Sequence, residues 1–226
     1  ADPCVFIHPT SNMIVAVYVD DLIMMTETEE QMRELKENMS IRFKMKDMGK
    51  LHYCLGVTIE QDVSGDWIKI HQKQYIANLI EKFGFANANS VATPADPNVK
   101  LCSDDGVSKE VDPKLYQSMT GSLLYAAIGT RPDIAKAVGA VAKFNSRPNE
   151  THLTAVKRIM RYLKGTADLA LQYTSNQTLV GYVDADWAGD VDNRHSTSGH
   201  IFMMAGGAVS WLSKKQPVVA LSTSEA

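Results

Sequence analysis

The sequence predicts an α+β protein made of two structural units, and three observations indicate this class. Several segments repeat apolar residues at helical spacing, three and four residues apart. Other segments either alternate apolar and polar residues or are continuously apolar over four to eight residues, the usual length of a strand. Between the two halves, residues 86–113 are rich in Pro, Asn, Asp and Ser and have little periodicity. A loop of this length is typical of a functional or linking segment, so we expect it to separate the units.

Composition narrows the class of protein. The chain has 226 residues, 45% of them hydrophobic and 22% charged, with a formal net charge of -3. These values are ordinary for a soluble protein, and no apolar run is long enough to cross a bilayer. The cysteines are odd in number and widely spaced, which favours a reducing intracellular compartment over a disulfide framework or a zinc site; they are Cys4, Cys54 and Cys102. Because strand-like sequence continues to the last residue, we expect a piece of a longer protein.

In the first half, residues 13–19 and 22–25 predict two buried strands joined at a pair of aspartates. A helix follows, for which Thr28 and Gln31 form a candidate capping box. Residues 51–61 and 66–72 predict two further strands connected by a hairpin. Residues 73–84 predict an amphipathic helix that stops at Gly84.

In the second half, three helices are expected at residues 113–129, 131–145 and 151–165. Pro113 and Pro132 suit first-turn positions, and Thr151 is the expected N-cap of the third helix. Strands are expected after them, at residues 169–173, 178–186, 199–205, 208–213 and 218–222. Sequential antiparallel strands with short turns predict a separate α/β unit.

Two neighbouring acids, Asp20 and Asp21, stand between the first two apolar strands. Aspartate is common in tight hairpin turns, so a turn is one explanation. Crowded carboxylates also repel one another and tolerate the crowding best when a cation lies between them. The pair alone leaves both explanations open.

A second set of acids, Asp184, Asp186 and Asp190, lies at the end of a predicted strand. Alternation places Asp184 and Asp186 on one face, which could begin a divalent-cation site because such sites need several oxygen ligands. A solvated acidic turn is the alternative.

Between the two acid sets lies a locally basic segment that contains only Asp133 and Glu150 as acids. A basic helical face suits a phosphate backbone, whereas a merely solvated face is the alternative. Two acid clusters and a basic helix together predict metal-assisted phosphoryl chemistry on a nucleic acid. The basic residues are Arg131, Lys136, Lys143, Arg147, Lys157, Arg158, Arg161 and Lys164.

The segment YVDDLIMM resembles the Y-x-D-D palm hairpin of reverse transcriptases. From about Phe6 to Ala226 the chain is similar, in the family's own order, to the copia-type (Pseudoviridae) LTR retrotransposon Pol polyprotein, in its reverse transcriptase and RNase H region. The segments that carry this resemblance are FKMKDMGKLHYCLGVTI, IHQKQYIANLIEKFGF, TPAD, YQSMTGSLLYAAIGTRPDIAKAV, HLTAVKRIMRYLKGT, GYVDADWAGD, RHSTSGHIF, VSWLSKKQ and ALSTSEA.

The resemblance implies the end of a reverse-transcriptase palm with thumb and connection helices, followed by a truncated RNase H-like α/β unit. The implied organisation is the C-terminal part of the reverse transcriptase in residues 1–85, a linker-like loop in 86–113, a helical thumb or connection region in 114–175, and the first RNase H strands in 176–226. The implied function is copying element RNA into DNA and degrading RNA in the RNA–DNA hybrid by metal-dependent phosphoryl transfer. The alternative is a degenerate or repurposed, non-catalytic nucleic-acid-binding remnant.

By resemblance, Asp20 and Asp21 are catalytic metal ligands, with Asp20 expected to be the stronger because adjacent strand residues point in opposite directions. Asp184 is the expected first ligand of the RNase H site. Glu225 is a weaker candidate, because the family pattern continues Glu-Ala-Glu-Tyr and the second glutamate would follow Ala226. His195 stands where an arginine is common. The residues expected to bind nucleic acid are Lys143, Lys157, Arg158, Arg161 and Lys164.

The resemblance further implies Mg²⁺ or Mn²⁺ as cofactor. The implied partners of the parent protein are an RNA template, a DNA primer, an RNA–DNA hybrid and dNTPs, without a membrane. It implies an intracellular location, in a cytoplasmic virus-like particle that could have a nuclear phase. Since a further palm aspartate and later RNase H acids lie outside this sequence, the isolated chain is expected to bind nucleic acid weakly and to be inactive.

Overall fold

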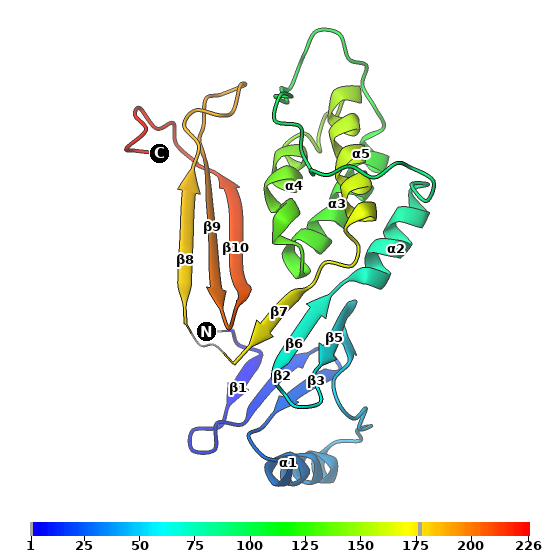
Figure 1. Cartoon of the computed structure of the whole chain (residues 1–226), viewed down its shortest axis with the longest axis vertical. Helices are drawn as coiled ribbons and strands as arrows, with labels where there is room; N and C mark the ends of the chain where they lie inside the picture. The colour runs from blue at the N-terminus through cyan, green and yellow to red at the C-terminus, as the bar shows by residue number, and fades with distance from the viewer. Residues whose placement is uncertain (1, 176–177) are drawn as a thin grey trace. The chain divides into compact units, whose positions relative to one another are not determined.

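The computed structural model describes residues 2–175 and 178–226 (Figure 1). The protein is a mixed α/β structure whose sheets are antiparallel, in agreement with the predicted class. It divides into two compact units, Ala1–Leu51 and His52–Ala226. This division falls near residue 51, and the loop 86–113 lies within the second unit. Among the described residues, no helix is both long enough and apolar enough to cross a membrane.

The first unit is a small antiparallel sheet followed by one helix. Its strands β1 (Val5–Ile7), β2 (Ile14–Tyr18) and β3 (Asp21–Met25) are hydrogen-bonded in that order, and α1 spans Glu29–Arg42. The predicted hairpin of β2 and β3 is confirmed. So is the capping box: the Gln31 N–H donates to Thr28 Oγ1, and the Thr28 N–H donates to Gln31 Oε1, each at 3.2 Å. Two of the orphan donors at the start of α1 are thereby satisfied.

The second unit begins with a four-stranded sheet of β4 (Tyr53–Cys54), β5 (Val57–Gln61), β6 (Trp67–His71) and β7 (Leu171–Thr174), in that order. The prediction of one strand over residues 51–61 is wrong, because a turn divides it. Leu55 and Gly56 have φ of 50° and 76°. Positive φ at both central residues is the conformation of a two-residue type I′ hairpin turn, which reverses the chain at this point.

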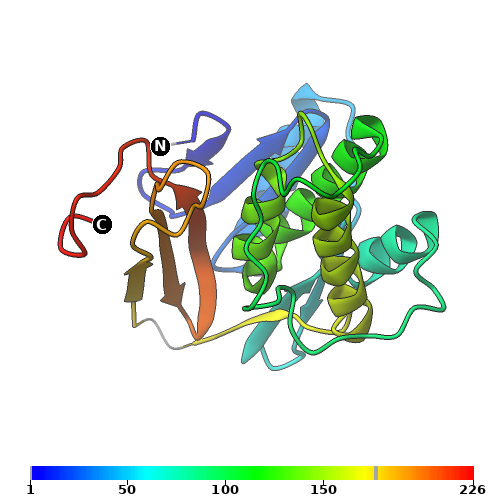
Figure 2. The same ribbon diagram turned by 90° about the horizontal axis from the view of Figure 1, so that it is seen from above.

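Four helices and one 3₁₀ turn form the core of the second unit (Figures 1 and 2). They are α2 (Lys73–Lys82), α3 (Pro113–Gly129), η1 (Pro132–Ile134), α4 (Ala135–Ala142) and α5 (Glu150–Gly165). Each contributes fully buried apolar side chains, among them Ile76, Leu123, Ile134, Val138 and Met160. Burial of such side chains is the main favourable term in folding, and it makes the helices a fixed base for the loops around them.

The ends of two helices can be explained residue by residue. Gly84, with φ of 76°, ends α2 as predicted: its N–H donates to the Glu81 carbonyl and the next N–H donates to Ile80, which is a Schellman motif. The predicted N-cap of α5, Thr151, is wrong. Asn149 is the cap, because its side chain accepts from the His152 N–H at 3.0 Å while His152 Nδ1 accepts from the Asn149 N–H.

The loop between α2 and α3 is bound along α5 (Figure 1). Arg161 Nε donates to the Asn89 carbonyl at 2.6 Å, and Lys164 Nζ donates to the Ala88 carbonyl at 2.8 Å. Further along the loop, His152 Nε2 contacts the Cys102 carbonyl oxygen at 2.8 Å. Because β6 precedes this loop and its partner β7 follows α5, the sheet and the helices on both sides of the loop form one unit.

A three-stranded sheet ends the second unit, in the order β10-β9-β8. Its strands are β8 (Val180–Ala185), β9 (Thr197–Met204) and β10 (Gly207–Lys215), and β10 packs against α4. The strand predicted at residues 218–222 is absent, since that stretch consists of bends and irregular backbone. Pro217 precedes it and lacks the N–H that a strand would need for a sheet ladder.

Candidate carboxylate sites and a basic cleft

The hairpin tip in the first unit presents both predicted aspartates to solvent. Tyr18 pairs with Asp21 across the hairpin, so Val19 and Asp20 form the two-residue turn. Both acids are exposed. Within the part of the chain that the structure describes, no hydrogen bond or ion pair engages either carboxylate. Their oxygens are thus open to an external ligand.

The turn holds Val19 in an unusual backbone conformation. Its φ is 52°, in the left-handed region that a β-branched residue rarely adopts. Residues of this kind cost of order 1–3 kcal/mol and persist only where surrounding structure enforces them. Here the β2–β3 ladder enforces the turn, and the turn determines where Asp20 stands.

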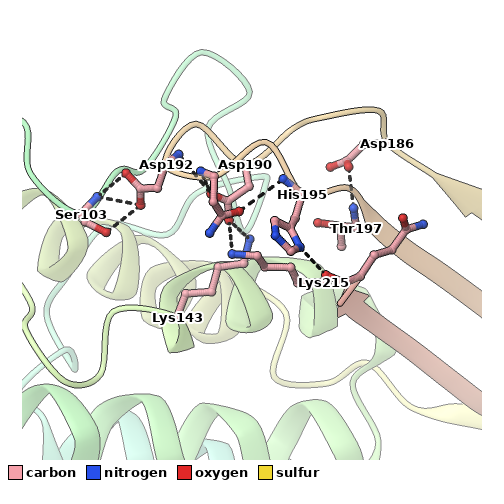
Figure 3. A network of polar contacts seen from close by, with 10 residues as sticks. Ser103, Lys143, Asp186, Asp190, Asp192, His195, Thr197 and Lys215 are labelled. Atoms are coloured by element: carbon pink, nitrogen blue, oxygen red, sulfur yellow. Dashed lines mark hydrogen bonds and ion pairs between the residues drawn. The ribbon is translucent and has the colours of Figure 1, made fainter. Parts of the chain in front are cut away.

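The three acids of the second set have different surroundings. Asp184 lies in β8 opposite Gly199 and is exposed. Asp186 follows the strand, and its Oδ1 accepts a hydrogen bond from the Thr197 N–H at 2.6 Å (Figure 3). A Cβ at Gly189 would clash with the Asp186 carboxylate, so this glycine allows the loop to fold closely over it.

Asp190 is engaged by two lysines from distant parts of the second unit (Figure 3). Its Oδ2 lies 3.1 Å from Lys143 Nζ at the end of α4 and 3.0 Å from Lys215 Nζ at the end of β10. The Asp190 side chain is only 8% exposed. Burial alone would raise its pKa, but hydrogen bonds from Lys215 and Lys143 hold the pKa of Asp190 at about 2. Asp190 is therefore a charged link between α4, β10 and its own loop.

Two further contacts hold the loop between β8 and β9 in place (Figure 3). Asp192 accepts from the Ser103 N–H and, at 2.7 Å, from the Ser103 hydroxyl. His195 Nδ1 contacts the Gln216 carbonyl oxygen at 2.7 Å. His195, which stands where the resemblance would place an arginine, thus serves to join this loop to the end of β10.

Three of the four predicted nucleic-acid-binding residues of α5 have protein partners. Arg158 donates to the Thr93 carbonyl and hydroxyl and lies 3.5 Å from Asp96. Arg161 and Lys164 bind the loop carbonyls described above. Of the predicted basic residues on α5, only Lys157 is exposed and engages no other described side chain or carbonyl.

A cleft of about 970 Å³ lies beside these residues in the second unit. Its walls come from α4, α5, residues 94–101 of the loop, the end of β10 and the segment around Asp186. The basic side chains that line it are Lys100, Lys136, Lys143, Lys157, Arg158, Arg161, Lys214 and Lys215. The acidic ones are Asp96, Glu150, Asp186 and Asp190, so positive charge predominates.

Sequence reasoning missed three of these cations, Lys100, Lys214 and Lys215. Adjacent lysines on a strand point to opposite faces, so the pair in VSWLSKKQ could have indicated that one of the two faces the helices, which in the structure is Lys215. The weaker candidate Glu225 lies in a local turn, where its Oε2 accepts from the Leu221 N–H at 2.7 Å.

The donor chemistry at the hairpin fits a divalent cation. Mg²⁺ prefers oxygen ligands, keeps several waters, and is commonly held by one or two carboxylates together with substrate phosphates. Asp20 and Asp21 offer two exposed carboxylates, and Asp184 offers one in the second unit. Among residues 2–175 and 178–226, no three or more His, Cys, Asp or Glu side chains form a group that could hold a metal ion.

Comparison with known proteins shows what the chain resembles. Residues 4–97 match the family described as reverse transcriptase (RNA-dependent DNA polymerase). The whole chain is 41% identical to the retrovirus-related Pol polyprotein from transposon TNT 1-94 of Nicotiana tabacum, covering 18% of that protein. It is 38% identical to the Pol polyprotein from transposon RE1 of Arabidopsis thaliana, covering 15%. A putative transposon Ty5-1 protein of Saccharomyces cerevisiae is 33% identical over 94% of the chain and 69% of its own length. No solved structure matches the chain significantly.

The hairpin with its paired aspartates and the match over residues 4–97 place the chain in the class of reverse transcriptases. The chain belongs to the family of copia-type LTR retrotransposon Pol polyproteins. It spans less than a fifth of the length of the two plant polyproteins.

Proposed function

We propose that this chain is part of an RNA-directed DNA polymerase with an associated RNase H, which copies element RNA into DNA and degrades the RNA strand of the hybrid. The observation that carries the proposal is the exposed Asp20–Asp21 pair at a tight β-hairpin in a chain of this family. The parent polyprotein would act on an RNA template, a DNA primer and dNTPs, inside the cell, in a cytoplasmic particle with a nuclear phase.

In this proposal Asp20 and Asp21 hold Mg²⁺ or Mn²⁺ in the polymerase site and Asp184 contributes to the RNase H site. A bound divalent ion would supply charge stabilisation for an in-line displacement at phosphorus. The chain's own contribution is positional. The β2–β3 ladder fixes the turn that carries Asp20, and the pairing of β8 with β9 fixes Asp184 opposite Gly199.

The domain assignment is part of the same proposal. Residues 1–85 would belong to the reverse transcriptase, 86–113 to a connecting loop, 114–175 to the thumb or connection, and 176–226 to the first strands of RNase H. Strands β8, β9 and β10 form a sheet of their own, distinct from the four-stranded sheet. This supports the assignment of the last segment to a different domain.

The test is primer extension by a Pol polyprotein that contains this chain, comparing Asp20→Asn and Asp21→Asn with the parent. We expect a loss of several orders of magnitude, larger for Asp20→Asn, because removing one member of a catalytic set disables the set. Glu37→Gln, an exposed acid on α1 in the same unit, is the matched control and should extend normally. Normal extension by both aspartate variants would refute the polymerase assignment.

A parallel assay measures RNA cleavage in an RNA–DNA hybrid. Asp184→Asn should abolish cleavage while leaving primer extension intact, and the exposed acid variant Glu81→Gln should change neither. Cleavage that survives Asp184→Asn would refute the RNase H assignment alone.

The basic cleft favours a second candidate function, a non-catalytic nucleic-acid-binding module. Its positive walls do not depend on Asp20, Asp21 or Asp184 acting as metal ligands. A polyprotein that binds hybrid tightly but neither extends a primer nor cleaves RNA would support this second function.

A further inference from the structure

The cleft beside α5 has an apolar floor as well as charged walls. Side chains of the loop, α4 and α5 form this floor, and on the loop Val99 is 50% exposed. A contiguous apolar surface that stays in contact with water marks a site of interaction. The apolar residues of the floor include Val99, Leu101, Ala140, Val141, Phe144 and Ala155.

Three cations at the rim of the cleft are available to a ligand. Lys100 lies on the loop, Lys136 on α4 and Lys157 on α5. All three are exposed, and the described part of the chain provides no hydrogen bond or ion pair for their ammonium groups. Lys214 is left out, because it lies on the face of β10 opposite to Lys215. The rim therefore offers three ammonium groups, from three different walls, to an external anion.

The acids of the cleft leave most of this charge unopposed. Asp190 is bound by two lysines, Asp96 lies 3.5 Å from Arg158 Nη1, and Asp186 accepts a backbone N–H. Among the described residues, Glu150 is the lining acid whose carboxylate has no such partner. Positive charge remains in excess, and a concave surface lined by one sign of charge focuses its field on the opposite sign.

The walls of the cleft are held in place by the protein itself. Arg158 fixes the loop to α5 through the Thr93 carbonyl and hydroxyl and through Asp96. On the other side, Asp190 binds one lysine from the end of α4 and one from the end of β10 (Figure 3). A site that is already formed binds its ligand with a smaller entropy cost, because fewer groups must be ordered.

We propose that this cleft is the docking site for an acidic amphipathic segment of a partner protein. Its apolar side chains lie on the floor, and its carboxylates bind Lys100, Lys136 and Lys157. Complementarity selects this class of partner, since the rim favours an anion and the floor favours aliphatic or aromatic side chains. An acidic peptide carries both. The inference goes beyond the proposed function and does not rest on it.

The size of the cleft suits a helical segment. Two turns of an α-helix, with a diameter of about 10–12 Å, displace roughly 1,000 Å³. The cleft measures about 970 Å³, so it can take up the inward side of a somewhat longer helix. Amphipathic helices bind other proteins in this way, with the apolar face in a groove and anchors three and four residues apart.

A nucleic acid strand fits the same surface less well. Its sugar–phosphate backbone would use the rim but gain little from the aliphatic floor. Proteins that bind single strands through their bases stack them on aromatic rings. In this cleft Phe144 is already stacked on His152, with ring centroids 3.8 Å apart, and Phe85 packs against the helical core.

The experiment measures fluorescence anisotropy of a labelled synthetic helix titrated with the 226-residue chain. The probe has about four turns, or roughly 14 residues, with leucines along one face and glutamates beside them. Two matched peptides carry glutamines in place of the glutamates, or serines in place of the leucines. We expect the probe to bind and each matched peptide to bind at least about tenfold more weakly, because each lacks one half of the complementary surface.

Variants of the rim test the charged contacts. Lys136→Ala/Lys157→Ala should weaken binding of the probe about tenfold, the combined contribution of two partly exposed ion pairs. Lys136→Arg/Lys157→Arg, which keeps both charges, should bind like the parent. The control is Lys109→Ala/Lys114→Ala, which removes the same charge from exposed lysines of the same unit outside the cleft.

A variant of the floor tests the apolar contact. Val99→Ser should weaken binding of the probe about fivefold, because the exposed half of this side chain is no longer buried by an apolar partner. Val107→Ser is the matched control, since Val107 is 87% exposed, belongs to the same loop and lies outside the cleft. It should bind the probe like the parent.

Three results would overturn the proposal. The first is failure of the probe to bind, or binding that neither the rim variant nor Val99→Ser weakens. The second is equal binding of the peptide with serines, which would show attraction of charge alone. The third is displacement of the probe by a single-stranded oligonucleotide at a lower concentration than unlabelled probe requires, which would make the cleft a nucleic acid site. None of these measurements depends on the roles proposed for Asp20, Asp21 or Asp184.

Discussion

Lys143 Nζ at the end of α4 lies 3.1 Å from Asp190 Oδ2, and the two residues are 47 positions apart in the sequence. Lys215 reaches the same oxygen from β10 at 3.0 Å. One carboxylate therefore joins a helix, a strand and the loop that follows Asp186. This arrangement gives Asp190 a structural function, although in the sequence it looked like a third member of an acidic ligand set.

Asp190→Asn should destabilise the second unit in a pH-dependent way. Hydrogen bonds from the lysines hold the pKa of Asp190 at about 2, below its ordinary value of 3.8. The stability that charged Asp190 contributes is therefore fully present above its pKa in the unfolded chain. It is lost as the pH falls through its pKa in the folded protein. The shift corresponds to about 2 kcal/mol. Urea unfolding should show a lower free energy of unfolding for Asp190→Asn than for the parent near pH 6, and a smaller difference between the two near pH 2.5. Glu81→Gln is the control. A difference that stays constant with pH would contradict the prediction.

Arg161→Ala should loosen the loop between α2 and α3. The substitution removes the 2.6 Å hydrogen bond to the Asn89 carbonyl, and a hydrogen bond from a charged donor contributes about 1.5–3 kcal/mol. We expect faster limited proteolysis within residues 86–113 and an unchanged salt dependence of nucleic acid binding. Lys109→Ala, in the same loop, is the control. A weaker salt dependence of that binding with unchanged proteolysis would show that Arg161 contacts phosphate instead.

His152 should remain neutral to a lower pH than an ordinary histidine, because its pKa is lowered. Burial lowers its pKa from 6.5, and its Nδ1 must stay unprotonated to accept the Asn149 N–H. The stability from neutral His152 is therefore full above pH 6.5 and is lost as the pH falls below that value. NMR titration of the ring measures the pKa directly. His152→Gln, which can still accept at this capping-box position, should flatten the pH dependence of unfolding below pH 6.5.

Val19→Gly should stabilise the β2–β3 hairpin by about 1 kcal/mol. Glycine adopts the positive φ at this position without the steric cost that valine carries, a gain partly offset by its greater freedom when unfolded. Hydrogen exchange of the β2 and β3 amides reports the change. Val17→Gly, in the paired part of β2, should have the opposite effect. Faster exchange in Val19→Gly would mean that the left-handed turn carries no strain.

Local features of the fold could be predicted from the sequence because their partners lie within a few residues. The capping box of Thr28 and Gln31 and the stop at Gly84 depend on contacts over three to five positions, and the β2–β3 ladder starts at a pair three positions apart, Tyr18 and Asp21. Two of the errors were also local, where the sequence offered two neighbouring signals. Asn149 replaced Thr151 as a cap, and the Leu55–Gly56 turn divided a strand that looked continuous.

The sequence by itself determined the family, the paired aspartates at the hairpin and the position of nearly every helix, because motif order and apolar spacing are properties of the chain. The tertiary structure alone decided which charges are free. In the sequence, Arg158, Arg161 and Lys157 are all cationic residues of one helix and nothing distinguishes them. Long-range packing brings loop carbonyls and Asp96 within reach of the two arginines and leaves Lys157 exposed. It likewise paired Lys215 from β10 with Asp190. A charged side chain becomes available for a ligand only when folding leaves it without an internal partner, and residues many positions away determine that.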